Sequence, residues 1–174
     1  MTLLEVLVAT LVGGLLFASL LSLTSFSARS FAALGNYVDL DRKSRNALDR
    51  MSQDIRQADL LTSFTSNSLV FQITTLTNTN KLALTFAYSP VNETLTRSFT
   101  GRTTVLLTGC KYYHHDVFQR NPTNGVFGQY PLDDPTRPDL AKVIQLTWIC
   151  SRDILGKSAN TESVQSAKVV IRKD

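Results

Sequence analysis

A run of 23 residues from Val6 to Ala28 contains no charged side chain and no proline. A bilayer hydrocarbon core of about 30 Å is crossed by roughly 20 apolar residues in a helix that rises about 1.5 Å per residue. The run is therefore long enough to span a membrane. It constrains the chain more than any other feature, because a helix that is apolar on all sides must be surrounded by lipid or by other protein.

A cleaved signal peptide and a simple signal anchor both fit this run less well. A secretory signal peptide has a basic n-region, a shorter apolar core and a cleavage site with small residues. Here nothing basic precedes the run, and the helical pattern continues beyond it. A simple signal anchor is expected to have Lys or Arg on its cytoplasmic side, and none lies upstream. We therefore expect Met1 to be the first residue of a processed chain.

Glu5 is the only charged side chain before Arg29. A carboxylate within a membrane costs about 2.5–3.5 kcal/mol on insertion scales, so a positive partner is expected. The α-amine of a mature Met1 is positive near neutral pH, and Glu5 lies one helical turn away. Two pairings are open. Glu5 caps the first turn of its own helix, or it pairs with the amine of another subunit and sets the axial stagger, because a wrong register leaves a buried charge unpaired.

The stretch MTLLEVLVATLVGGLL resembles the start of mature type IV pilins and of type II secretion pseudopilins. In that family an aromatic residue or Met comes first, then Thr-Leu-(Leu/Ile)-Glu and an apolar helix. The resemblance covers about 25 residues. It implies that prepilin peptidase cuts before Met1, that Met1 is N-methylated, and that Glu5 acts in assembly. The chain departs from many major pilins at Ser22, where they have a helix-breaking proline.

Gly13 and Gly14 are adjacent in the apolar run. Each glycine lowers helix propensity by about 1 kcal/mol relative to alanine. Local unwinding and close contact with another helix are both open, and small residues in membrane helices also serve packing alone.

Helical periodicity continues to about Leu60. Apolar or small residues recur at three- and four-residue steps, with charged residues between them, which predicts an amphipathic stripe. The stripe consists of Tyr37, Leu40, Ser44, Ala47, Leu48, Met51, Ile55 and Ala58. We expect one helix from about Thr2 to Leu60, apolar over residues 1–28 and amphipathic over 29–60, with a candidate bend at Gly35-Asn36.

After Leu60 the apolar period changes to two, which predicts antiparallel strands across residues 61–174. Pro90 to Glu93 is expected to be the turn of a hairpin. The segment from about 119 to 140 is rich in proline and glycine, so we expect a long surface loop there. The predicted fold class is α+β and pilin-like, with a long N-terminal helix packed by its second half on an antiparallel β-sheet. The arrangement of strands, with NETLTRSF and a late DLAKVIQLTWIC, also resembles J-type minor pseudopilins and W-like minor pilins.

Composition and motifs exclude several functions. There are 18 Lys and Arg against 14 Asp and Glu, and the densest basic stretch, residues 42–45, is flanked by aspartates. That is typical of a solvated helix face and not of a nucleic-acid site, which needs a basic stripe. No phosphate-binding loop, carboxylate pair or nucleophile elbow is present. We therefore expect no enzymatic activity and no cofactor.

Cys110 and Cys150 are the only cysteines. An even pair in a non-cytosolic domain predicts one disulfide, which would stabilise by roughly 3–4 kcal/mol in the chain-entropy model. The alternative is a nucleophilic cysteine with His114 or His115 as its base. That alternative lacks an orienting third group. His114-His115 as a metal pair is also disfavoured, because adjacent residues in a strand face opposite sides.

Two further motifs carry candidate sites. Asp133, Asp134 and Asp139 offer the oxygen ligands of a Ca²⁺ site, but their spacing fits no EF-hand and Arg137 lies among them, so we expect a solvated loop and no metal. Asn92-Glu93-Thr94 matches the N-x-[ST] acceptor for glycosylation in a predicted exposed turn.

These features predict a structural subunit that polymerises into a helical, type IV pilus-like extracellular filament. Its partners would be further copies of itself, other pilins or pseudopilins, prepilin peptidase, and the inner membrane before assembly. A minor pseudopilin in a short periplasmic fibre of a type II secretion system is the alternative within the family. Outside the family, the alternative is a membrane-anchored binding protein that stays monomeric.

Overall fold

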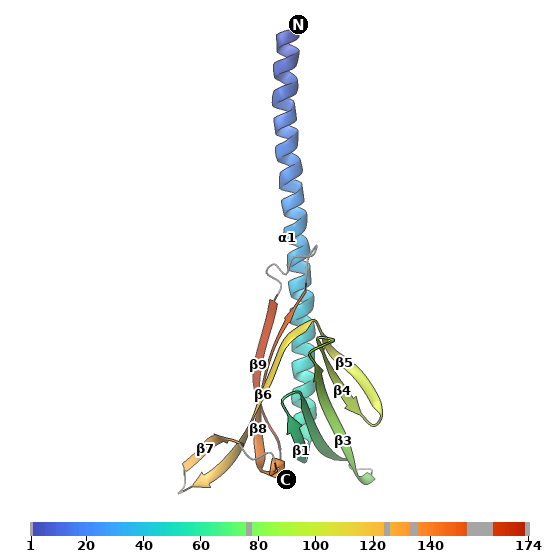
Figure 1. The fold of residues 1–174 in the computed structure, drawn as a ribbon, viewed down its shortest axis with the longest axis vertical. Helices are drawn as coiled ribbons and strands as arrows, with labels where there is room; N and C mark the ends of the chain where they lie inside the picture. The colour runs from blue at the N-terminus through green and yellow to red at the C-terminus, as the bar shows by residue number, and fades with distance from the viewer. Residues whose placement is uncertain (1, 76–77, 124–125, 133–135, 153–161, 173–174) are drawn as a thin grey trace.

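The computed structural model describes residues 2–75, 78–123, 126–132, 136–152 and 162–172. Helix α1 (Leu3–Gln57) has 55 residues. Its N-terminal part projects away from a β-rich domain, and its C-terminal part lies within that domain (Figure 1). The predicted helix is confirmed, three residues shorter at its C-terminal end than expected. Helical structure continues without a break through Gly13, Gly14 and Gly35.

The end of α1 is defined by the backbone at Ala58. This residue is extended, with φ −73° and ψ 139°, and its N–H donates to the Ile55 carbonyl at 3.2 Å. The next residue, Asp59, donates its N–H to the Gln72 carbonyl at 2.9 Å. The chain therefore passes directly from the helix into a sheet.

Two antiparallel sheets follow, where the sequence predicted one. The first has the order β1-β2-β3-β4-β5, and the second has the order β7-β6-β8-β9. The strands of the first sheet are β1 (Leu60–Thr65), β2 (Ser68–Thr75), β3 (Asn78–Ser89), β4 (Thr94–Phe99) and β5 (Arg102–Thr108). Those of the second are β6 (Cys110–Thr123), β7 (Val126–Pro131), β8 (Ala141–Ser151) and β9 (Glu162–Val170). A short 3₁₀ helix, η1 (Pro138–Leu140), precedes β8.

Gly109 connects the two sheets. Its φ is +67°, and a Cβ at this position would lie 2.6 Å from the Ser151 carbonyl oxygen. A side chain is therefore excluded both by the backbone conformation and by space. The Gly109 carbonyl also accepts the Ser151 N–H at 2.9 Å, so this tight passage fixes the start of β6 against the end of β8.

The prediction of a long loop over residues 119–140 is wrong as far as Pro131. β6 continues to Thr123 and forms a hairpin ladder with β7, in which Asn121 pairs with Gly128. The pairing of β6 with β8 ends at Gln119. Beyond that residue β6 is paired on one side only, and a sheet edge is where proline is tolerated. The predicted turn between β3 and β4 is confirmed, since Ser89 pairs with Thr94 across it.

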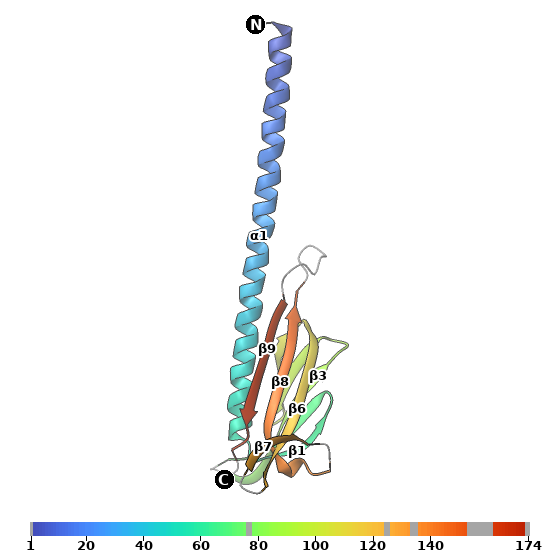
Figure 2. The same ribbon diagram turned by 90° about the vertical axis from the view of Figure 1, so that its left-hand side faces the viewer.

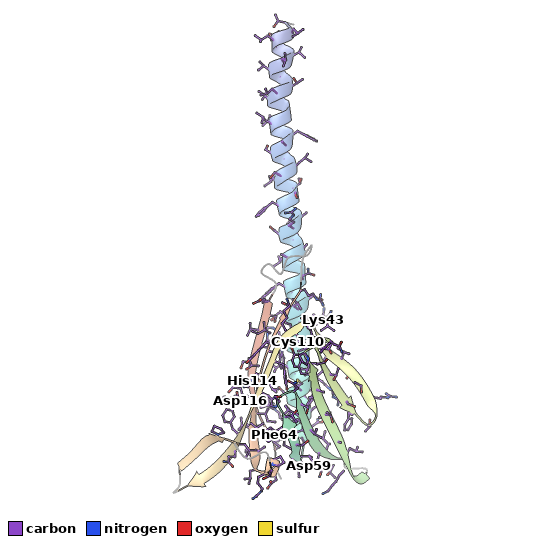
Figure 3. All side chains as sticks on the ribbon, viewed as in Figure 1. Lys43, Asp59, Phe64, Cys110, His114 and Asp116 are labelled. Carbon is purple, nitrogen blue, oxygen red and sulfur yellow. The ribbon has the colours of Figure 1, made fainter. Side chains whose placement is uncertain are left out.

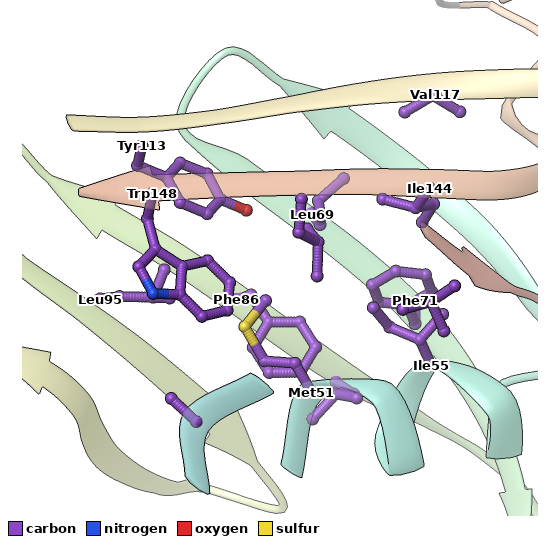
Figure 4. Packing of buried hydrophobic residues seen from close by; sticks show 14 of the residues in the cluster. Met51, Ile55, Leu69, Phe71, Phe86, Leu95, Tyr113, Val117, Ile144 and Trp148 are labelled. Carbon is purple, nitrogen blue, oxygen red and sulfur yellow. The ribbon is translucent and has the colours of Figure 1, made fainter. Parts of the chain in front are cut away.

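The hydrophobic core lies between α1 and both sheets. Figure 4 shows Met51 and Ile55 of α1 beside Phe71 and Phe86 of the first sheet and Trp148 of the second. All five side chains are fully buried. Burying each large apolar side chain contributes roughly 1.5–3 kcal/mol. The predicted stripe is largely confirmed, but Tyr37 remains 44% exposed because it lies above the domain.

Polar contacts also join α1 to the domain. Asp39 accepts a hydrogen bond from Arg152 at 2.6 Å, and Asp41 accepts one from Gln165 of β9 at 3.1 Å. Two i,i+4 ion pairs lie on the same helix, with Lys43 3.1 Å from Asp39 and Arg45 2.8 Å from Asp41. Figure 2 shows α1 along one side of the domain, with β9 beside its lower part.

Candidate functional site

The apolar stalk is the part of α1 from residue 3 to residue 38. Its large apolar side chains are exposed along the whole length, from Leu3 at 81% to Tyr37 at 44%. The helix is long and apolar enough to cross a membrane, and none of the most apolar window is covered by the rest of the chain. A contiguous apolar surface of this size marks contact with a membrane or with other protein.

A capping box lies at the head of the stalk. Thr2 is the N-cap of α1 and accepts the Glu5 N–H on its side-chain oxygen at 3.4 Å, while its own N–H donates to Glu5 Oε2 at 3.0 Å. Such caps stabilise a helix end by about 0.5–2 kcal/mol, and a carboxylate is favoured at the positive end of the helix dipole. Glu5 thus caps its own first turn, which is one of the two pairings left open by the sequence.

The second pairing of Glu5, with the Met1 amine of another subunit, requires a neighbouring chain. Met1, with its predicted processing and methylation, lies outside the described residues. Both hydrogen bonds that the Glu5 side chain accepts, from the Thr2 N–H and from the Thr2 hydroxyl, fall on Oε2. Within the described residues Oε1 accepts no hydrogen bond, so capping leaves one carboxylate oxygen available to a partner.

Gly13 and Gly14 are exposed in the interior of the stalk. A Cβ at either position would have no neighbouring atom within 4 Å. The fold of the single chain therefore gives no reason for two residues that weaken a helix. A reason has to come from the surroundings of the stalk, and close approach of a second helix is the one that glycines serve best.

Cys110 and Cys150 are brought together by the second sheet. They are directly opposed in the register of β6 and β8, and both are fully buried as free thiols. Opposed residues in antiparallel strands have Cα atoms about 4.5–5.5 Å apart, which lies within the range of about 4.4–6.8 Å that a disulfide needs. The arrangement suits the predicted disulfide, which stays a prediction.

Hydroxyl groups lie beside the thiol pair, and that of Tyr88 donates to the Cys110 carbonyl at 2.9 Å. Ser44 of α1 is fully buried next to Cys150, and Figure 3 shows Cys110 beside the part of α1 that carries Lys43. The hydrogen bond with Cys150, followed by burial, raises the pKa of Cys110 above its usual range. A raised thiol pKa disfavours the thiolate, so nucleophilic chemistry at Cys110 is disfavoured as well.

The two histidines face opposite sides of β6, as the sequence predicted. His114 is exposed and lies 3.0 Å from Asp116 through its Nε2. His115 is buried, and burial, with a smaller effect from His114, lowers its pKa to about 4. No hydrogen bond joins either histidine to a cysteine among the described residues, so the structure gives no support to a Cys–His nucleophile.

The remaining sequence candidates are surface positions. Asn92 is exposed in the turn between β3 and β4, where its N–H donates to Ser89 Oγ at 3.3 Å. Asp133 and Asp134 lie outside the described residues, and Asp139 pairs with Arg137 at 3.2 Å. In the part of the chain that the structure describes, no three potential metal ligands gather.

One buried ion pair was missed by sequence reasoning. Asp54 is only 4% exposed, and Arg97 of β4 binds it through Nε at 2.6 Å and Nη2 at 3.2 Å. The signal was present, because Asp54 lies three residues after Met51 and one before Ile55, on the side of α1 that faces the core. A charged residue at such a position predicts a buried partner.

No protein-family model matches the chain, and no curated protein matches it. The features that bear on its function are therefore those of its own residues: the apolar stalk, the capping box at the head of the stalk, and the glycine pair.

Proposed function

We propose that the chain is a structural subunit that polymerises through its apolar stalk into a helical, pilus-like filament. The single observation that carries the proposal is the exposure of the stalk beside a domain with a complete core of its own. The domain needs nothing more from the stalk for stability. The stalk, however, needs a surrounding apolar medium, which the membrane supplies before assembly and neighbouring stalks supply afterwards.

Glu5 provides the register of this bundle. Its Oε2 is held by the first turn of its own helix, and its Oε1 faces the Met1 amine of an adjacent subunit in the proposed filament. In an apolar bundle an unpaired carboxylate is strongly unfavourable, so helices slide until each Glu5 finds an amine. Gly13 and Gly14 let neighbouring helices approach closely below this contact.

The growth of a fibre follows from the symmetry of the contact. A carboxylate that pairs with the amine of the next subunit makes a head-to-tail contact, and such contacts form open helical polymers unless the rotation closes a ring. The β-rich domains would then form the outer shell. Prepilin peptidase would cut before Met1 and so free its amine, and an assembly ATPase would be a separate protein. The pilin-like resemblance of the first 25 or so residues supports the same arrangement.

The test must separate a role of Glu5 in assembly from its role as a cap. Glu5→Gln keeps a side chain that serves in a capping box but removes the charge. Thr2→Ala removes the N-cap side chain but keeps the charge. Both variants are expressed with a prepilin peptidase, and sheared surface fibres and membrane fractions are quantified by electron microscopy and immunoblotting. Mass spectrometry of the N-terminus reports processing and methylation.

We expect Glu5→Gln to remain in the membrane while fibres fall at least tenfold, and Thr2→Ala to assemble within about twofold of the unmodified chain. Equal losses in both variants would mean that Glu5 acts only as a cap. Normal assembly of Glu5→Gln would overturn the proposed pairing. Short fibres that form only with other pseudopilins would favour the minor pseudopilin, and a monomer that never leaves the bilayer would favour the anchored binding protein.

A further inference from the structure

Assembly through the stalk does not explain a charged cavity at the opposite end of α1. At the C-terminal end of α1 a cavity of about 590 Å³ opens between the helix and the first sheet. We call it the basic pocket. Its charged lining residues are Arg50, Arg56, Arg97, Arg172, Asp54 and Asp59. Figure 3 shows Asp59 at the lower end of the domain, far from the head of the stalk.

One side of the basic pocket is held rigid by an ion pair. Arg97 binds Asp54 through two nitrogens, and Arg50 lies 3.5 Å from the same carboxylate. The Arg97 guanidinium also lies over the Phe99 ring, 5.2 Å from its centroid. These contacts satisfy Asp54 and place a cation with fixed partners and an aromatic face on the wall of the pocket.

Ion pairs within the fold neutralise only some of the arginines that line the basic pocket. Asp54 is already paired with Arg97 and Arg50, and within the described residues neither Arg56 nor Arg172 forms a salt bridge. Four arginines against two aspartates leave an excess of two positive charges around one cavity. The negative end of the α1 dipole offsets only about half a charge. A ligand with negative charge is therefore favoured.

Asp59 narrows the chemistry of that ligand. Its Oδ2 is buried and accepts no hydrogen bond from the described residues. A carboxylate without a donor is unfavourable, and Asp59 lines the pocket, so a ligand that also supplies a donor to the accessible oxygen of this carboxylate fits best. An inorganic oxyanion offers mainly acceptors. A peptide offers side-chain carboxylates to the arginines and backbone N–H groups to Asp59, and it has apolar side chains for Ile73 and Phe99.

We propose that the basic pocket binds an acidic peptide segment of a partner protein, with carboxylates on Arg56 and Arg172 and a backbone N–H on Asp59. The volume of about 590 Å³ suits several residues, since ligand pockets generally enclose about 300–1,000 Å³. Both arginines are exposed at the rim, which suits a protein loop better than an enclosed small molecule. This interaction is independent of polymerisation through the stalk.

The test uses the full chain in detergent micelles and a fluorescein-labelled peptide with two glutamates flanking a phenylalanine. Fluorescence anisotropy gives the affinity. Arg56→Gln and Arg172→Gln are compared with Arg45→Gln, a matched control on the same helix whose arginine lies outside the pocket. The fluorescence of Trp148, the only tryptophan and fully buried, checks that each variant is folded.

We expect each pocket variant to weaken peptide binding about tenfold and Arg45→Gln to change it less than twofold. Replacing both glutamates of the peptide by glutamine should weaken binding at least tenfold, and Asp59→Asn should weaken it less than either arginine variant. Sodium phosphate at matched ionic strength should compete no better than sodium chloride. Equal losses in all three arginine variants, absence of peptide binding, or selective displacement by phosphate would each overturn the proposal.

Discussion

Residues 3–38 and 40–57 belong to one continuous helix, yet their apolar side chains have opposite surroundings. In the lower part, residues such as Met51 and Ile55 are fully buried under two sheets. In the stalk, residues such as Leu20 are more than half exposed. Local structure is the same in both, so the difference is set by the distribution of charge. The lower part has polar residues between its apolar ones, whereas the stalk has no charged residue between Val6 and Ala28.

This comparison teaches where the free energy of folding comes from. The lower part contributes to the core of a domain that folds around it. The stalk contributes to no core in a single chain, and its helix is stabilised by propensity, by the cap at Thr2 and by any apolar medium around it. Stability and assembly are therefore expected to respond to different residues of the same helix.

The largest expected effect is on the free energy of unfolding, and it should distinguish the lower part of α1 from the stalk. Met51→Ala removes a fully buried side chain and should lower the free energy of unfolding of the domain by about 2–5 kcal/mol, from lost transfer energy and a new cavity. Leu20→Ala on the stalk should change it by less than about 0.5 kcal/mol. Urea unfolding in detergent, followed by the fluorescence of Trp148, measures both. Comparable losses in the two variants would show that stalk and domain unfold as one unit.

The domain should also respond to redox conditions while the stalk does not. If Cys110 and Cys150 form the predicted disulfide, reduction with dithiothreitol should lower domain stability by roughly 3–4 kcal/mol. Cys110→Ser/Cys150→Ser should be insensitive to the reductant. Thiol counting under denaturing conditions, without reductant, reports the bond itself. Two free thiols per chain in material from an oxidising compartment would contradict the disulfide.

Features that depend on interactions between residues close in the sequence could be predicted, and features that depend on distant residues could not. The helix, its buried stripe and the turn at Pro90–Glu93 depend on neighbours within a few residues, and these predictions are confirmed except for the burial of Tyr37. The division into two sheets depends on which strands pair, and no local pattern records that β6 pairs with β7 and β8. The continuation of β6 through Pro122 was missed because proline excludes a central strand, while here β6 becomes an edge after Gln119. The pairing of Asp54 with Arg97 spans 43 positions, so only the unusual position of Asp54 could have pointed to it.

A pH titration should distinguish the domain from the stalk through His115. Burial lowers its pKa to about 4 in the folded chain, from 6.5. Its contribution to stability is therefore fully present above pH 6.5 and is lost as the pH falls towards 4, because the unfolded chain takes up the proton first. The loss should reach about 3 kcal/mol. The neighbouring His114 also lowers the pKa of His115, whereas Asp116 and a hydrogen bond with the Thr65 backbone oppose the lowering.

The matched control for this titration is the exposed neighbour. His115→Gln should flatten the decline in unfolding free energy between pH 6.5 and 4, measured by urea unfolding at each pH. His114→Gln should leave the decline in place, because the His114 side chain is exposed. An unchanged pH profile in His115→Gln would place the titrating group elsewhere in the domain.

The smallest effect on stability should be the most informative about the stalk. Gly13→Ala and Gly14→Ala have no neighbouring atom to meet within 4 Å in the single chain, so each should raise helix stability by about 1 kcal/mol or less. Circular dichroism in micelles against temperature measures this gain. In the proposed filament the added methyl groups would lie where helices approach closely, so fibre yield should fall although the subunit is more stable. Ala9→Gly, the reverse change nearby, should weaken the helix without adding bulk. If both glycine variants assemble normally, the glycines serve neither contact nor unwinding, and the stalk surface that matters lies on another face of α1.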